Sequence, residues 1–461
     1  MNKELNIPIL PKEHQFAKVK ATHELNLEAI CIFMATGFFL DDDTYWRDNV
    51  CLLPGHNHIL DENNLLIESK SWFNWHYSPR DISFNDALGE YKYLLHTIVK
   101  EQVGDSPVIL PLSGGLDSRS QALILKDLNN PVHAFSYSFK GGFPEHKISK
   151  QIAALFGFSF EYFQIQKGYL WDVIDELATI NNCYSEFTHP RQMSVLKELR
   201  QMKGIFSLGH WGDVLFDRGV PEGTLEEDVM PLLLKKMLKP KGLELAEQLW
   251  KTWQLKGDFI SYFTYRVEKS LAKIKVDNIS ARIRAFKTSQ WAHRWTTTNL
   301  SVFEAAHPIT LPYYDNRMCE FICTIPEEFL ADRRLQIAHL QENKVLSKIV
   351  WQEQKPFNLT NYKFNKSPYN LLYRTVNKVQ REFRSIFGNP YIQRNFELQF
   401  QGKENNKILK QYLFSVGMQS LVPKEIVKYF FDSFNSKNYV AYSHPISMLL
   451  TLAVWQQKFR K

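Results

Sequence analysis

The six residues Ser113–Ser118 read SGGLDS and place one acid among two serines and two glycines. Such a loop exposes backbone N–H groups, and the N-terminus of a following helix adds partial positive charge, so that together they bind anions. The glycines let the backbone approach a phosphate without an intervening Cβ. Asp117 would repel a phosphate unless a Mg²⁺ ion lay between them, because Mg²⁺ prefers carboxylate and phosphate oxygens. The stretch therefore predicts a site for a phosphate and a magnesium ion.

The segments on either side must position this loop. Residues 107–110 form a short apolar run, typical of a buried parallel strand, and the apolar residues of 122–128 have helical spacing. Further along, the same reasoning predicts strands at 132–139, 158–165 and 204–209 and helices at 145–157 and 190–202. This alternation predicts an α/β fold, a parallel sheet with helices on both faces, whose ligands bind beyond the carboxyl ends of the strands. From about residue 226 the pattern is helical, with irregular stretches at 355–367 and 402–406.

Length, composition and cysteine content limit the classes of protein to which this chain can belong. The 461 residues correspond to two to four domains of ordinary globular composition, with 44% hydrophobic and 23% charged residues. A net charge of +7 suits anionic nucleotides and does not by itself indicate nucleic acid. Five cysteines without a C-x-x-C pair argue against zinc ribbons and redox motifs. The amino end lacks a signal-peptide pattern, and the apolar run 29–40 is too short to span a bilayer. We therefore expect a reduced, soluble, cytoplasmic protein without membrane or nucleic-acid partners.

The loop at Ser113–Ser118 is neither a G-x-x-x-x-G-K-[ST] P-loop nor a G-x-G-x-x-G turn. It resembles the SGGxDS pyrophosphate loop of the PP-loop ATP pyrophosphatases, and a chance turn rich in serine and glycine is the alternative. A second loop, GHWGDVLF at Gly209–Phe216, is similar to the G-E-G-x-D-E-x-F loop of the asparagine synthetases and β-lactam synthetases. The segment Leu311–Phe329 also resembles a segment of that family, with Asp315 at its acid.

The resemblance implies an adenine nucleotide α-hydrolase-like fold with a large helical C-terminal part and a small N-terminal β segment. It also implies ATP and Mg²⁺ as cofactors. The implied ATP contacts are Leu112, Ser113, Gly114, Gly115, Leu116, Asp117, Ser118, Tyr137 and Gly209. The implied metal ligands are Asp117 and Asp213, and the implied catalytic residues are His210 and one of Lys363 and Lys366, with Lys363 preferred. Strand packing is an equal alternative for Leu112 and Tyr137, as is an ordinary surface position for each lysine.

Two residues of the second loop depart from the family pattern, because His210 and Val214 stand where the family has glutamates. In the family the first glutamate orders the acyl acceptor or takes the proton of the amine. A histidine could take that proton near neutral pH, and the rate would then rise with pH through about 6.5. The change could equally mean a different substrate or a lost activity.

The amino end also departs from the family. Glutamine-dependent members begin with a cysteine after the initiator methionine, whereas this chain reads Met1-Asn2, and the pyrophosphate loop follows early, at residue 113. The segment 44–75 still resembles the hairpin that ends the glutaminase domain, including its PGH turn. We therefore expect residues 1–85 to be a truncated remnant of a glutamine amidotransferase domain. Residues 86–461 would form the synthetase-like domain, with a sheet core at about 105–220 and a helical part at about 221–461.

The resemblance implies a carbon–nitrogen ligase of the asparagine synthase type, which adenylates a carboxylate and forms an amide, with asparagine biosynthesis as the family default. Without the glutaminase cysteine, the nitrogen would come from ammonia, from a separate glutaminase partner or from an amine. One alternative is a catalytically altered ATP-binding or scaffold protein, favoured by the two lost glutamates and opposed by the two retained metal acids. The other is a PP-loop enzyme acting on tRNA, which usually carries catalytic cysteines or basic strips beside the loop.

Overall fold

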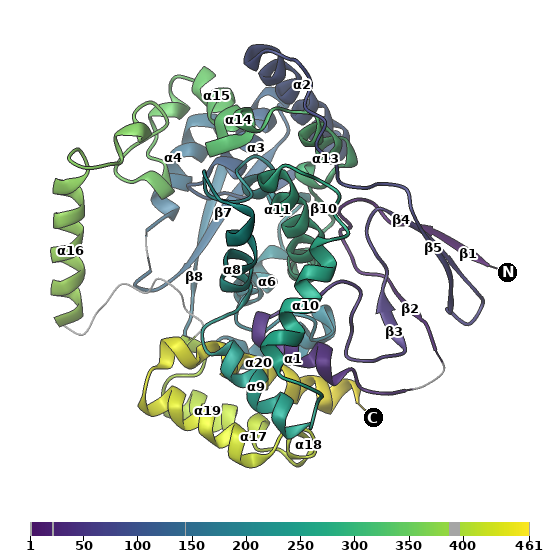
Figure 1. Ribbon diagram of the computed structural model, residues 1–461. Coiled ribbons are helices and arrows are strands. Elements are labelled where there is room, and N and C mark those ends of the chain that lie inside the picture. Colours follow the sequence, from purple (N-terminus) through teal and green to yellow (C-terminus); the bar gives the residue numbers. More distant parts are fainter. Residues whose placement is uncertain (1, 21–22, 143, 387–396, 461) are drawn as a thin grey trace.

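The computed structural model describes residues 2–20, 23–142, 144–386 and 397–460, and a five-stranded parallel sheet lies at its centre (Figure 1). The strand order is β10-β9-β6-β7-β8. The strands are β6 (Val108–Pro111), β7 (Val132–Phe139), β8 (Ser159–Ile165), β9 (Ile205–Ser207) and β10 (Ile309–Thr310). The four strands predicted from the sequence are confirmed. The two-residue β10 was not predicted, because it is too short to show a pattern.

Helices cover both faces of the sheet, as predicted. Alternate residues of β6 point to opposite sides, so that Val108 and Leu110 belong to one hydrophobic cluster and Ile109 to another. The first cluster is completed by α2 (Phe84–Val103), α3 (Leu116–Leu128), α4 (His146–Phe156), α13 (Asn316–Cys323) and α15 (Arg334–Glu342). The second includes residues of α6 (Leu196–Leu199) and α12 (Thr297–Glu304). The parallel α/β architecture is therefore confirmed.

Two of the predicted local structures need correction. The helix expected at 190–202 is a 3₁₀ turn, η1 (Arg191–Val195), followed by the four-residue α6. There the Ser194 hydroxyl donates to the Arg191 carbonyl oxygen and competes with regular helix bonding. The stretch 402–406 is not irregular, because Gly402, with φ of 97°, precedes α17 (Lys403–Leu413) and the polar residues after it form the exposed first turn of that helix.

The rest of the chain is mainly helical, as predicted. The further α-helices are α5 (Leu170–Asn181), α7 (Gly212–Leu215), α8 (Glu226–Met237), α9 (Gly242–Thr252), α10 (Phe259–Leu271), α11 (Ile279–Lys287), α14 (Glu327–Leu330), α16 (Leu371–Ile386), α18 (Val416–Gln419), α19 (Lys424–Ser436) and α20 (Tyr439–Phe459). The nine-residue η2 (Thr288–Thr296) is a π-helix. Among the described residues, no helix is both long and apolar enough to cross a membrane.

The N-terminal segment forms two small antiparallel sheets and one helix. The sheets are β1-β4-β5 (Lys3–Asn6, His56–Leu60, Leu66–Ser71) and β2-β3 (Phe16–Lys18, Asn49–Cys51). The helix α1 (Leu27–Thr36) is buried from Ala29 to Thr36 and shares one hydrophobic cluster with α9 and α20, beside which it lies in Figure 1. The domain boundary near residue 85 remains a prediction.

Candidate active site

The loop after β6 is braced by its own side chains. The Ser113 and Ser118 hydroxyl oxygens lie 2.9 Å apart, and the Gly115 N–H donates to the Ser113 hydroxyl at 3.1 Å. The Gly114 N–H donates to a carboxylate oxygen of Glu145 at 2.9 Å. These two N–H groups thus already have oxygen acceptors from the protein, beside the N-terminus of α3, where an anion would bind.

The loop after β9 lies directly against Asp117, because β9 is the neighbour of β6 in the sheet. A Cβ added at Gly209 would lie 3.0 Å from the Asp117 Cβ. A Cβ added at Gly212 would overlap the Asp117 Oδ1 and lie 2.8 Å from the Tyr313 ring. Only glycine allows this approach, which brings Asp213, in the first turn of α7, to the same place as Asp117.

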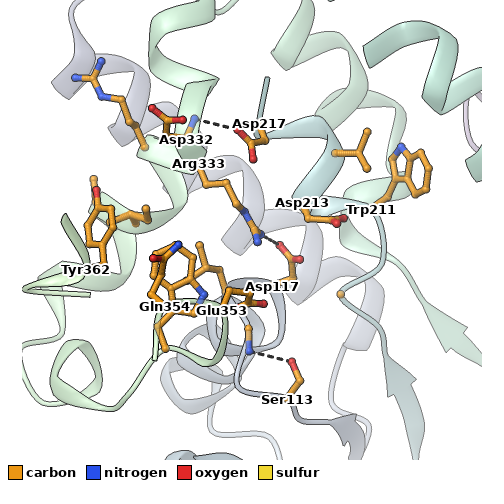
Figure 2. A pocket seen from close by; sticks show the side chains of 18 of the residues that line it. Ser113, Asp117, Trp211, Asp213, Asp217, Asp332, Arg333, Glu353, Gln354 and Tyr362 are labelled. Atoms are coloured by element: carbon orange, nitrogen blue, oxygen red, sulfur yellow. Dashed lines mark hydrogen bonds and ion pairs between the residues drawn. The ribbon is translucent and has the colours of Figure 1, made fainter. Parts of the chain in front are cut away.

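The Asp117 carboxylate is bound by two side chains that the sequence analysis did not single out. The Arg333 guanidinium forms an ion pair with Asp117 Oδ1, and the Gln336 Nε2 donates to the same oxygen at 2.8 Å. Burial raises the pKa of Asp117 to about 6, while Arg333 opposes the rise and the nearby Asp213 adds to it. Figure 2 shows Arg333 reaching toward Asp117 with Asp213 beside them. The Asp117 carboxylate is therefore largely withdrawn from solvent, and its pKa depends on the charges of Arg333 and Asp213.

Arg333 is held in place by an unusual turn before α15. Asp332 and Arg333 have φ values of 56° and 60°, a left-handed conformation that costs non-glycine residues on the order of 1 kcal/mol each. The Asp332 N–H donates to the Asp217 carboxylate at 3.0 Å (Figure 2), and the Arg333 Nε donates to Gln336 Oε1 at 2.7 Å. These contacts hold the guanidinium at Asp117.

The segment 349–354 is fastened to the loop by Arg119, which is fully buried in α3. Its guanidinium donates to the carbonyl oxygens of Ile349 and Gly114, at 3.1 and 3.0 Å, and to that of Val350. The Gln352 N–H donates to the Gly114 carbonyl at 3.2 Å. This clamp fixes one wall of the site.

A cavity of about 1090 Å³ opens where these elements meet. Its lining includes Ser113, Gly115, Leu116, Asp117, Gly209, His210, Trp211, Asp213, Trp295, Arg333, Trp351, Glu353, Gln354, Tyr362 and Lys363. Lys363, on the 3₁₀ turn η7 (Tyr362–Phe364), thus reaches the cavity, whereas Lys366 is exposed and does not line it. The structure therefore brings together the two acids, the loop, His210 and one of the two candidate lysines.

His210 lies at the cavity wall with its ring 6.0 Å from that of Phe303, edge to face. Burial lowers the pKa of His210 to about 4, and the neighbouring Asp213 opposes the shift. The expected titration near 6.5 is therefore replaced by one near 4. Because the imidazole is neutral at physiological pH, it offers a lone pair or an N–H group, but it is a weaker base than an ordinary histidine.

Three other candidate residues lie in the framework behind the cavity. The Leu112 side chain is buried, and its N–H donates to the Phe135 carbonyl between strands. Tyr137 stacks on Phe135, with ring centroids 6.3 Å apart, and is not part of the cavity lining. Asp315 caps α13 by accepting from the Arg317 N–H. Leu112 and Tyr137 remain predictions as ATP contacts.

Sequence reasoning missed Arg333, Gln336, Glu353 and Arg119. Arg119 directly follows Ser118, and this place next to the loop is a signal that could have been used. Arg333, Gln336 and Glu353 belong to no sequence motif that includes the loop. Arg333, for example, lies 216 residues beyond Asp117. The packing of α15 onto α3 brings Arg333 and Gln336 to Asp117, and the Arg119 contacts hold the segment that carries Glu353.

The loop of serines and glycines and both acids lie at the point where the strand order of the parallel sheet reverses, between β6 and β9. In open parallel α/β sheets ligands bind at this switch point, beyond the carboxyl ends of the strands. The family profile described as asparagine synthase matches residues 90–422, more than half of the sequence, and the chain therefore belongs to the asparagine synthase family. This membership places it among ATP-dependent synthetases.

Two solved structures show partial similarity. NMN synthetase from Francisella tularensis is 16% identical, over 30% of this chain and 58% of that chain, with a TM-score of 0.22. A predicted subunit of tRNA methyltransferase from Methanocaldococcus jannaschii DSM is 22% identical, over 29% and 64%, with a TM-score of 0.17. The chain thus spans less than two thirds of the length of either. No match was found among curated proteins.

The two acids fit a magnesium ion chemically. Asp213 is exposed to the cavity and makes no hydrogen bond or ion pair among the described residues, and Asp117 lies across from it with one partly exposed carboxylate. Two carboxylates beside a phosphate loop are a donor set that Mg²⁺ prefers. Arg333 supplies the balancing charge at Asp117 in the structure.

Proposed function

We propose that this protein is a carbon–nitrogen ligase that uses ATP to adenylate a carboxylate, releasing pyrophosphate, and then forms an amide with ammonia or an amine, releasing AMP. The observation that carries the proposal is the meeting of Asp117 and Asp213 from neighbouring parallel strands at one cavity. That cavity, of about 1090 Å³, has room for a nucleotide and a second substrate.

Each part of the site has a role in this reaction. The N–H groups of the loop and the N-terminus of α3 bind the pyrophosphate portion of ATP. Asp117 and Asp213 would hold Mg²⁺, which when bound neutralises charge on the leaving pyrophosphate. Lys363, at the cavity wall, offsets charge that develops on the phosphorus and on the acyl oxygen. His210, neutral at physiological pH, contacts the incoming amine.

The acyl substrate is proposed to be larger than aspartate. Trp211, Trp295, Trp351 and Tyr362 line the cavity beside the acids, and aromatic walls suit a sugar, a peptide or an apolar acyl group. The replacement of the family glutamate by His210 supports the same view. The nitrogen would come from ammonia, a partner glutaminase or an amine.

A scaffold that binds ATP without turnover is the second candidate. This candidate is favoured because side chains of the protein already bind the groups that ATP and a metal ion would use. Glu145 accepts from the Gly114 N–H, and Arg333 pairs with Asp117. For catalysis, Glu145 must give up this position to a phosphate oxygen.

The exchange of labelled pyrophosphate into ATP, screened over carboxylates with ammonium present, separates the two candidates. The ligase predicts exchange that requires both Mg²⁺ and one class of carboxylate. Asp117→Asn should lose exchange, whereas Asp127→Asn, the same change at the exposed far end of α3, should retain it. ATP binding without exchange for any carboxylate would support the scaffold instead.

A further inference from the structure

Away from the proposed active site, His14, Cys51 and His293 converge from three parts of the chain. His14 precedes β2, Cys51 ends β3, and His293 lies on the π-helix η2. One potential ligand atom from each lies within 4.8 Å of the others, and Cys51 and His293 are fully buried. Segments of π-helix are rare and occur frequently at functional sites. Nothing in the ligase mechanism uses these three residues.

The geometry of the cluster suits a metal ion. The Cys51 Sγ lies 3.5 Å from the His293 Nε2. Two ligands of one tetrahedral zinc ion, with Zn–S near 2.3 Å and Zn–N near 2.0–2.1 Å, are separated by about 3.5 Å. The His293 Nδ1 is buried without a hydrogen-bond partner among the described residues, so the ring is not fully accounted for by protein contacts.

One ring nitrogen of His14 is engaged by the protein backbone. Its Nε2 lies 2.5 Å from the His293 carbonyl oxygen, and the two rings pack edge to face at 5.2 Å. When Nε2 carries the proton and donates to that carbonyl, the lone pair of Nδ1 is left for a metal. Histidines that bind metals commonly donate their other ring N–H to a carbonyl in this way.

Charged groups of both signs lie beside the cluster. Arg294, the next residue on η2, donates to the backbone carbonyls of Asp41 and Asp43 and so lies against a run of three acids, residues 41–43. The Cys51 N–H donates to the Asp42 carbonyl at 2.9 Å, which places the same run beside the thiol. His293 also lines a separate cavity of about 440 Å³.

We propose that His14, Cys51 and His293 bind one Zn²⁺ ion, with water as the fourth ligand, and that the ion fastens the N-terminal sheets to the helical part. A small hydrophobic cluster under these strands contains only Ile7, Ala17, Leu52 and Leu60 as buried residues. A structural metal compensates for a small core of this kind. The ligands lie 37 and 242 residues apart, so no local sequence motif reveals them.

The test uses the full-length chain, freed of metal with a chelator and titrated with Co²⁺ and then Zn²⁺. The expected result is one Co²⁺ per chain with a thiolate-to-cobalt charge-transfer band, and displacement of Co²⁺ by Zn²⁺. Cys51→Ser should abolish the band and weaken binding at least tenfold. Cys323→Ser is the matched control, because Cys323 is also buried and its Sγ lies 3.2 Å from the Cys319 carbonyl, a bond that serine keeps.

His14→Gln keeps the test valid if Cys51→Ser fails to fold, because His14 is only half-buried. This variant should lower Zn²⁺ affinity at least tenfold while its circular dichroism stays that of the parent. The absence of a cobalt band in the folded parent, or an intact band in Cys51→Ser, would overturn the proposal.

Discussion

The loop after β6 and the loop after β9 both place an acid in the first turn of a helix, but they hold it differently. Asp117 begins a helix of 13 residues and is bound by Arg333 and Gln336. Asp213 begins a helix of four residues and faces the cavity without a partner among the described residues. The first loop is thus preorganised by packing, whereas the second leaves its acid available. The difference teaches that two acids at one cavity can differ in freedom, because tertiary contacts fix Asp117 and leave Asp213 without a bonded partner among the described residues.

Removal of either acid should have the largest effect. Asp117→Asn and Asp213→Asn should each reduce pyrophosphate exchange by about 10²–10³-fold, because each removes a charge that stabilises the transition state. Mg²⁺ titration of the exchange rate, with Asp127→Asn as the control, measures the loss. If either variant exchanged pyrophosphate as fast as the unsubstituted protein, the proposal that both acids hold Mg²⁺ would be wrong.

Disturbing the contact between the two loops should reduce pyrophosphate exchange nearly as much. Gly212→Ala places a Cβ against Asp117 and the Tyr313 ring, so exchange activity and thermal stability should both fall. Gly89→Ala is the matched control, since it lies in α2 with nothing within 4 Å of the added Cβ. It should raise the free energy of unfolding by about 0.5–1 kcal/mol. Full activity in Gly212→Ala would show that the loops separate during turnover.

The hold of Arg333 on Asp117 predicts a pH effect. In the proposed reaction the Asp117 carboxylate holds Mg²⁺, and a proton competes with the ion for this group below its pKa, so the activity of the parent should fall as the pH drops through about 6. Arg333→Met removes the charge that keeps this pKa down, and the acid limb of the pH–rate profile should move up by about 1–3 units. Arg333→Lys should restore most of the original profile. An unmoved limb in the methionine variant would assign the limb to another group.

The smallest effect on pyrophosphate exchange is expected for substitution of His210, which lies in the loop after β9. His210→Ala should retain pyrophosphate exchange and lose amide formation, measured as product from the same carboxylate. Because burial holds its pKa near 4, amide formation by the parent should show no rise through pH 6.5 that the variant lacks. Joint loss of exchange and amide would place His210 in the adenylation step, and retention of both would leave it a packing residue.

Local pattern determined much of this protein. Apolar runs and glycine positions predicted four strands and the parallel sheet, because buried strands and helix ends depend on nearby residues. For example, Gly157, with φ of 73°, ends α4 at the last residue of the helix predicted over 145–157. The SGGLDS and GHWGDVLF loops also located the two acids that line one cavity, since each loop is a contiguous stretch of sequence.

Tertiary structure alone decided the charge state and the walls of the site. Arg333 reaches Asp117 across 216 residues, and burial sets the pKa values of Asp117 and His210 far from their usual values. Packing likewise selected Lys363 over Lys366 as a cavity residue and joined His14 to Cys51 and His293. These features depend on desolvation and on contacts between distant segments, quantities that no short stretch of sequence contains.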